Sequence, residues 1–412
     1  MALQLTHLEQ EILEGRHGAA KQLAMELMVT LGEGCGATRL IPIKSVHLVL
    51  HAYKSAFDAG VETAEKIADM GAKFSVPTTI DPYGMDAEDW RAAKTPEHYA
   101  KMQIRLEKAV EKMGVIPVWT CTPYYGFNMP RFGEHLAWSE SSAVAFANTV
   151  LGARTNRQSA IIDICCGILG LAPEIGLHLD AHRRGEVLVK LQAPRPLKDW
   201  EYAALGFRLG QRLGSRIGVV DGMQGSPSTE NLKTLCAAAA ASGPVALLHI
   251  VGVTPEARTL EEAFGGNKPV ETITIDESTL LEIRAGMNTH KGKEIDFIAL
   301  GCPHYSINEI IRVKDLLRGR KVHPTVTMWI YANSYAIAMA EKMGIRKELE
   351  AAGITIRAET CMIISPIHEW GFKTIMTDSG KCVHYAPMEC GTDMVFAGTD
   401  ECVEAAVAGH VM

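Results

Sequence analysis

The chain has 412 residues, of which 47% are hydrophobic and 22% charged, the composition of a globular protein long enough for two or three packed units. The formal net charge of −7, with basic residues scattered along the chain, excludes the positively charged footprint of a nucleic-acid-binding protein. The longest apolar stretch, residues 236–253, contains Ser, Gly, Pro and His and predicts a buried helix, turn and strand instead of a membrane span.

The N-terminal residues form an amphipathic pattern with acidic side chains, which is not the pattern of a secretory signal. We therefore expect a cytoplasmic protein whose ten cysteines are reduced thiols. No two cysteines have CxxC spacing, which disfavours zinc ribbons and many electron-transfer clusters. Metal or cluster binding remains open to some of these thiols.

The predicted elements begin with a helix over residues 9–31, where apolar residues recur every three and four positions. The glycine cluster at residues 32–36 follows this helix and precedes a strand expected at 39–43. A dinucleotide-binding motif has the reverse order, so the cluster is interpreted as a helix C-cap.

Strand-like and helix-like segments alternate through the rest of the chain. This rhythm predicts an α/β fold of parallel or mixed sheets flanked by helices, in two or more packed subdomains with a possible boundary near residues 205–225. Strands are expected at residues 73–77, 115–119, 216–220, 245–251, 297–300, 325–330 and 354–356, and helices at 96–113, 228–241, 306–317, 333–343 and 401–408.

Three cysteines stand where an apolar, strand-like run breaks into a polar turn: Cys121, Cys302 and Cys361. The carboxyl ends of strands are where α/β proteins build ligand sites. Three thiolates converging there could hold an iron–sulfur cluster with one iron left open, a Lewis acid able to bind a substrate hydroxyl. A cysteine taken alone is more often a small buried hydrophobe. Cys382 and Cys390 remain possible substitutes for one of the three.

A concentrated polar segment covers residues 133–157, where two polar clusters flank an apolar, helix-like stretch. Arginine offers a planar fork that grips a carboxylate or phosphate through two hydrogen bonds, and asparagine and threonine can fix a neighbouring hydroxyl. A capped helix with surface arginines is the alternative. The candidate substrate-binding residues are Ser141, Ser142, Arg154, Thr155, Asn156 and Arg157.

Three further side chains are candidates for proton transfer. His304 lies close to Cys302 in the chain, where an imidazole could tune a cluster or move a proton, although a lone histidine is more often structural. Lys381 could pair with an anionic substrate or act as an acid, and Tyr385 could relay a proton. The alternative for this segment is a polar loop with a surface lysine.

Six segments spread over most of the chain share the pattern of one protein family: TCTPYY (120–125), GEHLAWSESSAV (133–144), NTVLGARTNR (148–157), LGCPHYS (300–306), ETCMIISP (359–366) and TDSGKCVHYAP (377–387). In these segments the chain resembles the aconitase X family, and specifically its large catalytic subunit. The resemblance implies an aconitase-like fold and a hydro-lyase whose iron–sulfur centre is held by Cys121, Cys302 and Cys361. It also implies that residues 154–157 and the Lys381 loop face the substrate.

Two activities are known in this family: bacterial members dehydrate cis-3-hydroxy-L-proline and archaeal members dehydrate 5-phosphomevalonate. One mechanism suits both, in which an open iron pulls on the leaving hydroxyl, cations hold the carboxylate and a base takes the α-proton. Ten Cys, 18 Met and 15 His are not the reduced use of labile residues found in hyperthermophiles, and no cluster of cations indicates a phosphate pocket. We therefore expect the hydroxyproline as substrate, with phosphomevalonate as the alternative.

The resemblance implies one further part, a small swivelling domain with a Gly/Ser-rich segment whose serine is the expected base. No such segment follows Lys381, where the chain continues into the helix expected at residues 401–408. We therefore expect residues 1–412 to be the large catalytic region, the swivelling domain to be a separate small subunit, and the chain to be inactive alone.

Two other classes of protein fit parts of the sequence. A mononuclear metal hydrolase could use His135, His304 or His384 with carboxylates, but the chain has no HxH or HExxH pair. A non-catalytic assembly subunit would need its cysteines only for packing. For this chain we expect neither a membrane nor a nucleic-acid partner.

Overall fold

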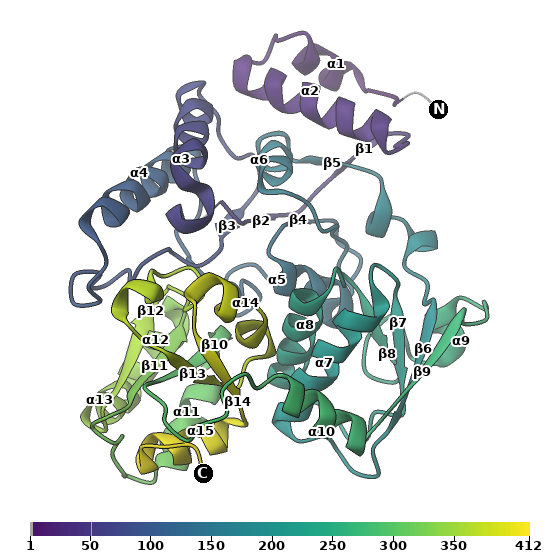
Figure 1. Ribbon diagram of the computed structural model, residues 1–412. Helices are drawn as coiled ribbons and strands as arrows, with labels where there is room; N and C mark the ends of the chain where they lie inside the picture. Colours follow the sequence, from purple (N-terminus) through teal and green to yellow (C-terminus); the bar gives the residue numbers. More distant parts are fainter. Residues whose placement is uncertain (1–2, 51) are drawn as a thin grey trace.

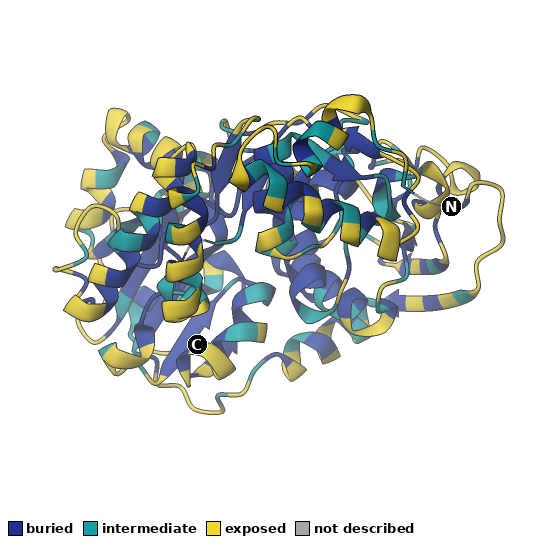
Figure 2. Ribbon diagram, turned by 90° about the horizontal axis from the view of Figure 1, so that it is seen from above, coloured by how far each residue is buried: buried dark blue, intermediate teal, exposed yellow. Residues whose placement is uncertain are grey.

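The computed structural model describes residues 3–50 and 52–412, which fold into three α/β units in chain order (Figure 1). In this view the N-terminal unit lies at the top, the middle unit at the lower right and the C-terminal unit at the lower left. Buried residues are concentrated in the strands and on the inward faces of the helices (Figure 2). The expectation of an α/β fold with parallel or mixed sheets flanked by helices is confirmed.

The N-terminal unit is built on a parallel sheet with the strand order β3-β2-β4 and on an antiparallel pair of β1 with β5. Helices α3 and α4 pack against each other, as do α2 and α6. Its elements are α1 (His7–Leu13), α2 (Ala19–Gly34), β1 (Leu40–Pro42), β2 (Val46–Leu48), α3 (Tyr53–Asp69), β3 (Thr78–Ile80), α4 (Glu97–Met113), β4 (Ala137–Trp138), α5 (Ser141–Phe146), the π-helix η1 (Ala147–Leu151), α6 (Ala160–Leu169), β5 (Leu171–Pro173) and the 3-10 turns η2 (Gly176–His178) and η3 (Asp180–His182).

The middle unit contains a parallel sheet with the order β8-β7-β6-β9. Helices α7 and α8 pack closely because Gly206 has no side chain: a Cβ there would lie 2.2 Å from the backbone oxygen of Leu235. Its elements are β6 (Val187–Gln192), α7 (Asp199–Leu213), β7 (Gly218–Asp221), α8 (Thr229–Ser242), β8 (Leu248–Ile250), α9 (Leu260–Phe264), β9 (Glu271–Asp276) and α10 (Glu277–Gly286).

The C-terminal unit contains a parallel sheet with the order β12-β11-β10-β13-β14. Every residue of the central strand β10 is buried, as expected for a parallel strand covered on both faces. Its elements are β10 (Phe297–Tyr305), α11 (Ile307–Leu317), β11 (Thr327–Ala332), α12 (Ser334–Lys342), α13 (Ile345–Ala351), β12 (Ile354–Ala358), the 3-10 turn η4 (Ile367–Trp370), β13 (Thr374–Thr377), α14 (Gly380–Cys390), β14 (Asp393–Phe396) and α15 (Thr399–Ala408).

An irregularity in β10 shapes the edge of this sheet. The pairing of β10 with β11 shifts between Leu300 and Tyr305. Gly301 lies inside the shift with a φ of 99°, and a Cβ there would come within 2.2 Å of the Tyr331 oxygen, so only glycine fits. The strand therefore leaves the regular ladder immediately before Cys302.

Most elements expected from the sequence are present, with three differences. Residues 73–77, expected as a strand, lie in the irregular segment before β3. The single helix expected over residues 9–31 is divided into α1 and α2, because Gly15 and Gly18 adopt positive φ values of 80° and 95°. The strand expected at residues 115–119 is only an isolated bridge between Ile80 and Trp119. The glycine cluster after α2 is a helix end, as expected, with Gly36 at a φ of 74°.

The boundary expected near residues 205–225 falls inside the middle unit. Helix α7 and strand β7 both belong there, and β7 pairs with β6 and β8. The chain passes from one sheet system to the next between β5 and β6, and again between β9 and β10.

Within residues 3–50 and 52–412, no helix combines the length and the apolar character needed to cross a bilayer.

Candidate active site

A cavity of about 500 Å³ lies between the N-terminal and C-terminal units. Cys121, Cys302 and Cys361, which the sequence singles out, all contribute to its wall. The described residues that line it include, from the N-terminal unit, Lys54, Phe57, Asp81, Ser139, Glu140, Ser141 and Arg157, and from the C-terminal unit, Ile363, Ile364, Lys381, Tyr385 and Glu389.

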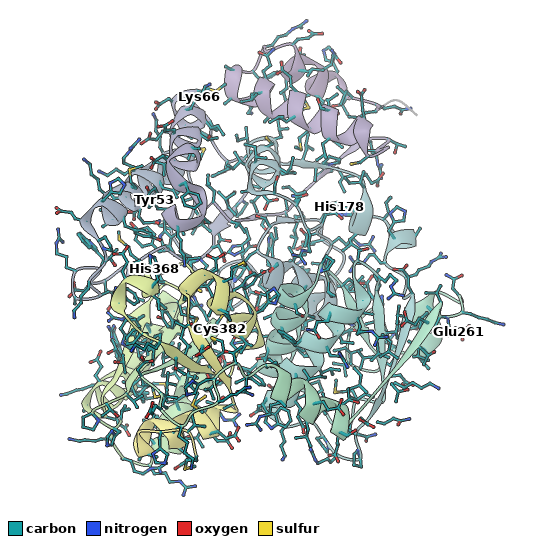
Figure 3. The ribbon with its side chains drawn as sticks, in the orientation of Figure 1. Tyr53, Lys66, His178, Glu261, His368 and Cys382 are labelled. Carbon is teal, nitrogen blue, oxygen red and sulfur yellow. The ribbon has the colours of Figure 1, made fainter. Side chains whose placement is uncertain are left out.

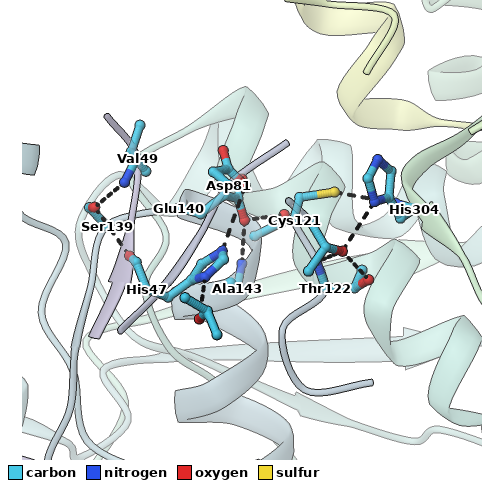
Figure 4. Close-up of polar contacts among 12 residues, drawn as sticks. His47, Val49, Asp81, Cys121, Thr122, Ser139, Glu140, Ala143 and His304 are labelled. Carbon is cyan, nitrogen blue, oxygen red and sulfur yellow. Dashed lines mark hydrogen bonds and ion pairs between the residues drawn. The ribbon is translucent and has the colours of Figure 1, made fainter. Parts of the chain in front are cut away.

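Cys121 lies on the segment that continues past the bridge of Trp119 to β3. Its side chain is buried, with 5% exposure, and its sulfur accepts a hydrogen bond from the backbone N–H of His304 at 3.3 Å (Figure 4). Burial raises the pKa of the Cys121 thiol. The contact with His304 joins the N-terminal unit to the C-terminal unit at the cavity wall.

Cys302 and Cys361 both come from the C-terminal unit, Cys302 from the irregular end of β10 and Cys361 from the turn after β12, with β11 between the two strands. A hydrogen bond between the two thiols raises the pKa of Cys302 and lowers that of Cys361. The backbone N–H of Ile363 also donates to the Cys361 sulfur, at 3.4 Å. Cys361 is therefore the cysteine best prepared to be a thiolate.

Lys381 forms an ion pair with Glu140 at the cavity wall. The Glu140 carboxylate also accepts from the Ser142 hydroxyl and from the Ala143 backbone N–H, both at 2.6 Å, so it caps α5. Although burial opposes both charges, the pairing raises the pKa of Lys381 well above its usual value and lowers that of Glu140 to about 2. The Lys381 ammonium group is thus held in the same cavity as the cysteines, and the Lys381 side chain is 14% exposed.

The cysteines fit the donor set of an iron–sulfur cluster. Three thiols from three separate segments line one cavity beside a cation, and two of them accept backbone N–H bonds that stabilise a thiolate. No fourth cysteine is found among the described residues that line the cavity. In the part of the chain that the structure describes, no three or more His, Cys, Asp or Glu side chains gather in the way that a single metal ion requires.

The sequence placed six substrate-binding candidates in residues 133–157, and the cavity receives only some of them. Ser141 and Arg157 line it. Arg157 donates to the backbone oxygens of Ala240 and Gly243, at 3.2 and 2.9 Å, which tie its guanidinium to the end of α8. Tyr385 also lines the cavity, on α14 one turn after Lys381.

Arg154, Thr155 and Asn156 do not line this cavity, which corrects their expected placement against the substrate. Arg154 pairs with Asp180 and donates to the His178 oxygen at 3.1 Å. Figure 3 shows His178 well away from Cys382, the neighbour of Lys381. The Thr155 hydroxyl accepts from the Trp138 N–H, and the Asn156 side chain holds the turn at residues 175–177. These side chains stabilise the loop that carries Arg157.

Two further candidates lie behind the wall. Ser142 is 1% exposed and supports Glu140 instead of reaching the cavity. His304 is fully buried, with its ring nitrogens bonded to the Thr120 hydroxyl at 3.1 Å and the Thr360 oxygen at 2.6 Å. Burial lowers its pKa to about 4, and both ring nitrogens are bonded to protein groups behind the cavity wall.

The histidines of the alternative metal hydrolase do not converge. His135 contacts His178, His304 is buried against Thr360, and His384 packs against Phe207. The substitutes considered for the cluster cysteines are also placed elsewhere: neither Cys382 nor Cys390 lines the cavity. Both are buried in α14, where each lies close enough to Cys361 to interact with it electrostatically.

The sequence interpretation missed Glu140 and Asp81 as cavity residues. Glu140 had a local signal, since an acidic residue directly before a helix beginning at Ser141 is a typical N-cap. Asp81 follows β3, at the same kind of strand end as the cysteines, and its Oδ1 atom lies 3.7 Å from Nε2 of His47. A search of the predicted strand ends for acidic residues, as well as for cysteines, would have found Asp81.

Behind the cavity, Asp163 of α6 is fully buried and accepts hydrogen bonds from Gln158 and Ser139. Burial raises the pKa of this carboxyl from 3.8 to about 7. The folded state therefore binds this proton more tightly than the unfolded state does. The contribution of the Asp163 carboxyl to stability is present in full below pH 3.8 and is lost as the pH rises through 7.

We expect Asp163→Asn to raise the free energy of unfolding at pH 8 by up to about 4 kcal/mol, and to change it little at pH 4. Urea unfolding of both proteins across this range measures the difference. The control is Asp276→Asn, at the half-buried N-cap of α10, where hydrogen bonds lower the pKa to about 2 and no gain at pH 8 is expected. A constant difference between pH 4 and pH 8 for Asp163→Asn would contradict the assignment.

Comparison with known proteins agrees with this geometry. Family models described as the first, second and third domains of aconitase X match residues 2–181, 185–285 and 295–408. The chain belongs to the aconitase X family. The three matched ranges also coincide with the three structural units, so the boundaries between family domains lie where the sheets change.

Relatives of this aconitase X chain are named as dehydratases, which confirms the prediction of a hydro-lyase. The chain is 38% identical to the phosphomevalonate dehydratase large subunit of Methanocaldococcus jannaschii, over 96% of this chain and 98% of that protein. It is 37% identical to the cis-3-hydroxy-L-proline dehydratase of Pseudomonas aeruginosa, over 98% of this chain and 70% of that one. The crystal structure of Thermococcus kodakaraensis aconitase X in its holo-form superposes with a TM-score of 0.90 at 37% identity, covering 98% of this chain and all of that one.

Proposed function

We propose that this chain is the large subunit of an iron–sulfur dehydratase that removes water from a small hydroxy-carboxylate, with cis-3-hydroxy-L-proline as its substrate. The observation that carries the proposal is the meeting of Cys121, Cys302 and Cys361 in one cavity with Lys381 and Arg157. Relatives named as dehydratases of two hydroxy acids support the reaction class.

In this proposal the three cysteines hold the cluster, and each remaining polar group has a separate task. When bound, the cluster supplies an open, Lewis-acidic iron at which a hydroxyl can leave. Arg157 binds the substrate carboxylate through its planar fork. Lys381 keeps its proton because Glu140 holds it, so it supplies a fixed positive charge or a hydrogen bond beside the leaving hydroxyl. Tyr385 completes the polar wall as a candidate proton relay.

The balance of charges in the cavity favours a substrate with one carboxylate. Lys381 is paired with Glu140, and Lys54 lies 3.7 Å from Glu389 while donating to backbone oxygens. Among the described residues, Arg157 forms no ion pair with a carboxylate. The Arg157 guanidinium is therefore available to one substrate carboxylate, whereas a phosphorylated acid would bring further negative charge to a wall that also carries the Asp81 carboxyl.

Phosphomevalonate is the second candidate substrate because large subunits named for it match this chain almost from end to end. The same coverage supports a partner. The chain spans 98% of one such large subunit but 70% of the hydroxyproline dehydratase, which leaves 30% of that relative outside the match. We propose that a small subunit with a swivelling domain provides the base that removes the α-proton.

The deciding experiment is anaerobic reconstitution of the chain with iron, sulfide and its small subunit, followed by assays on both substrates. Turnover of cis-3-hydroxy-L-proline supports the proposal, and turnover of phosphomevalonate alone transfers it to the second candidate. An iron-free, inactive complex would overturn it. The chain assayed without its partner is expected to show no turnover, and appreciable activity would contradict the need for a small subunit.

We expect Arg157→Met to raise the KM for the hydroxy acid about 10- to 100-fold, the equivalent of one lost charge-assisted hydrogen-bond pair. Steady-state kinetics of the reconstituted complex measure the change. Arg154→Met is the matched control, because Arg154 pairs with Asp180 and is absent from the cavity wall. Equal effects on KM from the two substitutions would contradict the assignment of Arg157 to the carboxylate.

A further inference from the structure

His304 connects the segments that carry the cysteines. Its ring lies between Thr120, the residue before Cys121, and Thr360, the residue before Cys361. His304 itself follows Cys302 by two positions on β10. A single buried side chain thus touches two of the cysteine segments and belongs to the third.

Each polar group of His304 has a partner in the structure. The backbone N–H donates to the Cys121 sulfur at 3.3 Å (Figure 4), and the backbone oxygen accepts from Lys233 at 3.0 Å. Since the Thr360 carbonyl can only accept, Nε2 carries the ring hydrogen, and Nδ1 accepts from the Thr120 hydroxyl. This arrangement requires one tautomer of the ring and leaves no ring nitrogen free for a substrate.

The partners of His304 come from all three units. Thr120 belongs to the N-terminal unit, Lys233 to α8 of the middle unit, and Thr360 to the C-terminal unit. Lys233 is itself buried, with 1% exposure. A ligand set drawn from distant segments must be held against their relative movement, and hydrogen bonds behind the ligands are the usual means.

We infer that His304 is a positioning residue that holds the Cys121 and Cys361 segments at the spacing a bound cluster needs. The inference rests on the proposed function, since it assumes that the three cysteines bind iron. It differs from acid–base catalysis because it acts through the threonines that precede two ligands. It assigns the two Thr-Cys pairs, residues 120–121 and 360–361, to one hydrogen-bonded unit.

The test is retention of iron after anaerobic reconstitution. We expect His304→Ala to lose iron to a chelator about 10- to 100-fold faster than the parent chain, the usual effect of removing a residue that orients metal ligands. His304→Gln should restore much of the retention, because its amide N–H reaches the Thr360 oxygen. In the iron-free chain, mass spectrometry should show faster alkylation of Cys121 and Cys361 in His304→Ala.

The control is His249→Ala in β8, which removes an equally buried histidine bonded to the Arg183 oxygen at 2.7 Å. It should lower the unfolding temperature without faster loss of iron. If His304→Ala fails to fold, Thr120→Val removes the hydroxyl that bonds Nδ1 of His304 and the hydroxyl and backbone N–H of Thr122, and it should also accelerate the loss. Unchanged retention in the folded variant overturns the inference while leaving the proposed function intact, whereas a parent chain that binds no iron overturns both.

Discussion

Cys302→Ser is expected to abolish dehydration by the reconstituted complex and to prevent stable binding of the cluster. The proposed cluster provides Lewis-acid stabilisation of several kcal/mol, so its loss corresponds to a decrease in kcat of on the order of a thousandfold or more. Serine nearly preserves the volume of the side chain and removes the thiolate, which separates ligation from packing. Iron and sulfide analysis, the visible absorption spectrum and kcat are measured on the same preparation.

Cys390→Ser is the control for this prediction. Cys390 is buried like Cys302, but its thiol donates to the Met362 oxygen and does not line the cavity. It should lower stability slightly while the iron content and kcat stay near the parent values. A Cys302→Ser protein with full iron content would remove Cys302 from the proposed ligand set and reopen the choice of cysteines.

Comparison of the sequence with the structure shows why the cysteines could be predicted. Each ends an apolar run, and in parallel sheets the ends of such runs meet on one side. The local sequence pattern at Cys302 therefore indicated the side of the sheet on which this cysteine lies. The contribution of Gly301 did not appear in that pattern, because its need for a positive φ arises from the close approach of the Tyr331 backbone.

The polar segment of residues 133–157 shows the opposite case. Its composition predicted substrate contacts along its whole length, yet Arg154 turns to Asp180 and Arg157 turns to the cavity. The direction of each side chain depends on the bridge of His135 to Arg154 and on packing against η2, which are contacts between distant residues. Residue types alone do not indicate where the side chains of Arg154 and Arg157 point.

The pairing of Glu140 with Lys381 could not be predicted from the local sequence either, because the two residues are 241 positions apart.

Lys381→Met is expected to reduce kcat by about 100- to 1,000-fold, as for the removal of one preorganised electrostatic donor. The same substitution leaves Glu140 buried without its cation and should destabilise the chain by about 3–5 kcal/mol. Activity and stability would thus fall together, and a second substitution is needed to separate them.

Glu140→Gln in the Lys381→Met background provides that separation. The amide keeps an oxygen for Ser142 and Ala143 and carries no charge, so urea unfolding at pH 8 should recover much of the lost stability while kcat stays low. The exposed pair Lys112–Asp69 is the control, and the corresponding double substitution there should change stability by no more than about 1 kcal/mol. Recovery of kcat in the double variant would show that Lys381 acts only in folding.

The pH dependence of this comparison checks its physical cause. In the parent chain the pKa of Glu140 is lowered from 4.5 to about 2, so its stabilising contribution is present above pH 4.5 and is lost as the pH falls toward 2. Without Lys381, burial raises that pKa, and the carboxyl destabilises the fold increasingly as the pH rises. The stability difference between the parent and Lys381→Met should therefore be largest near pH 8 and should shrink toward pH 4. A difference independent of pH would mean that packing, and not the ion pair, accounts for the loss.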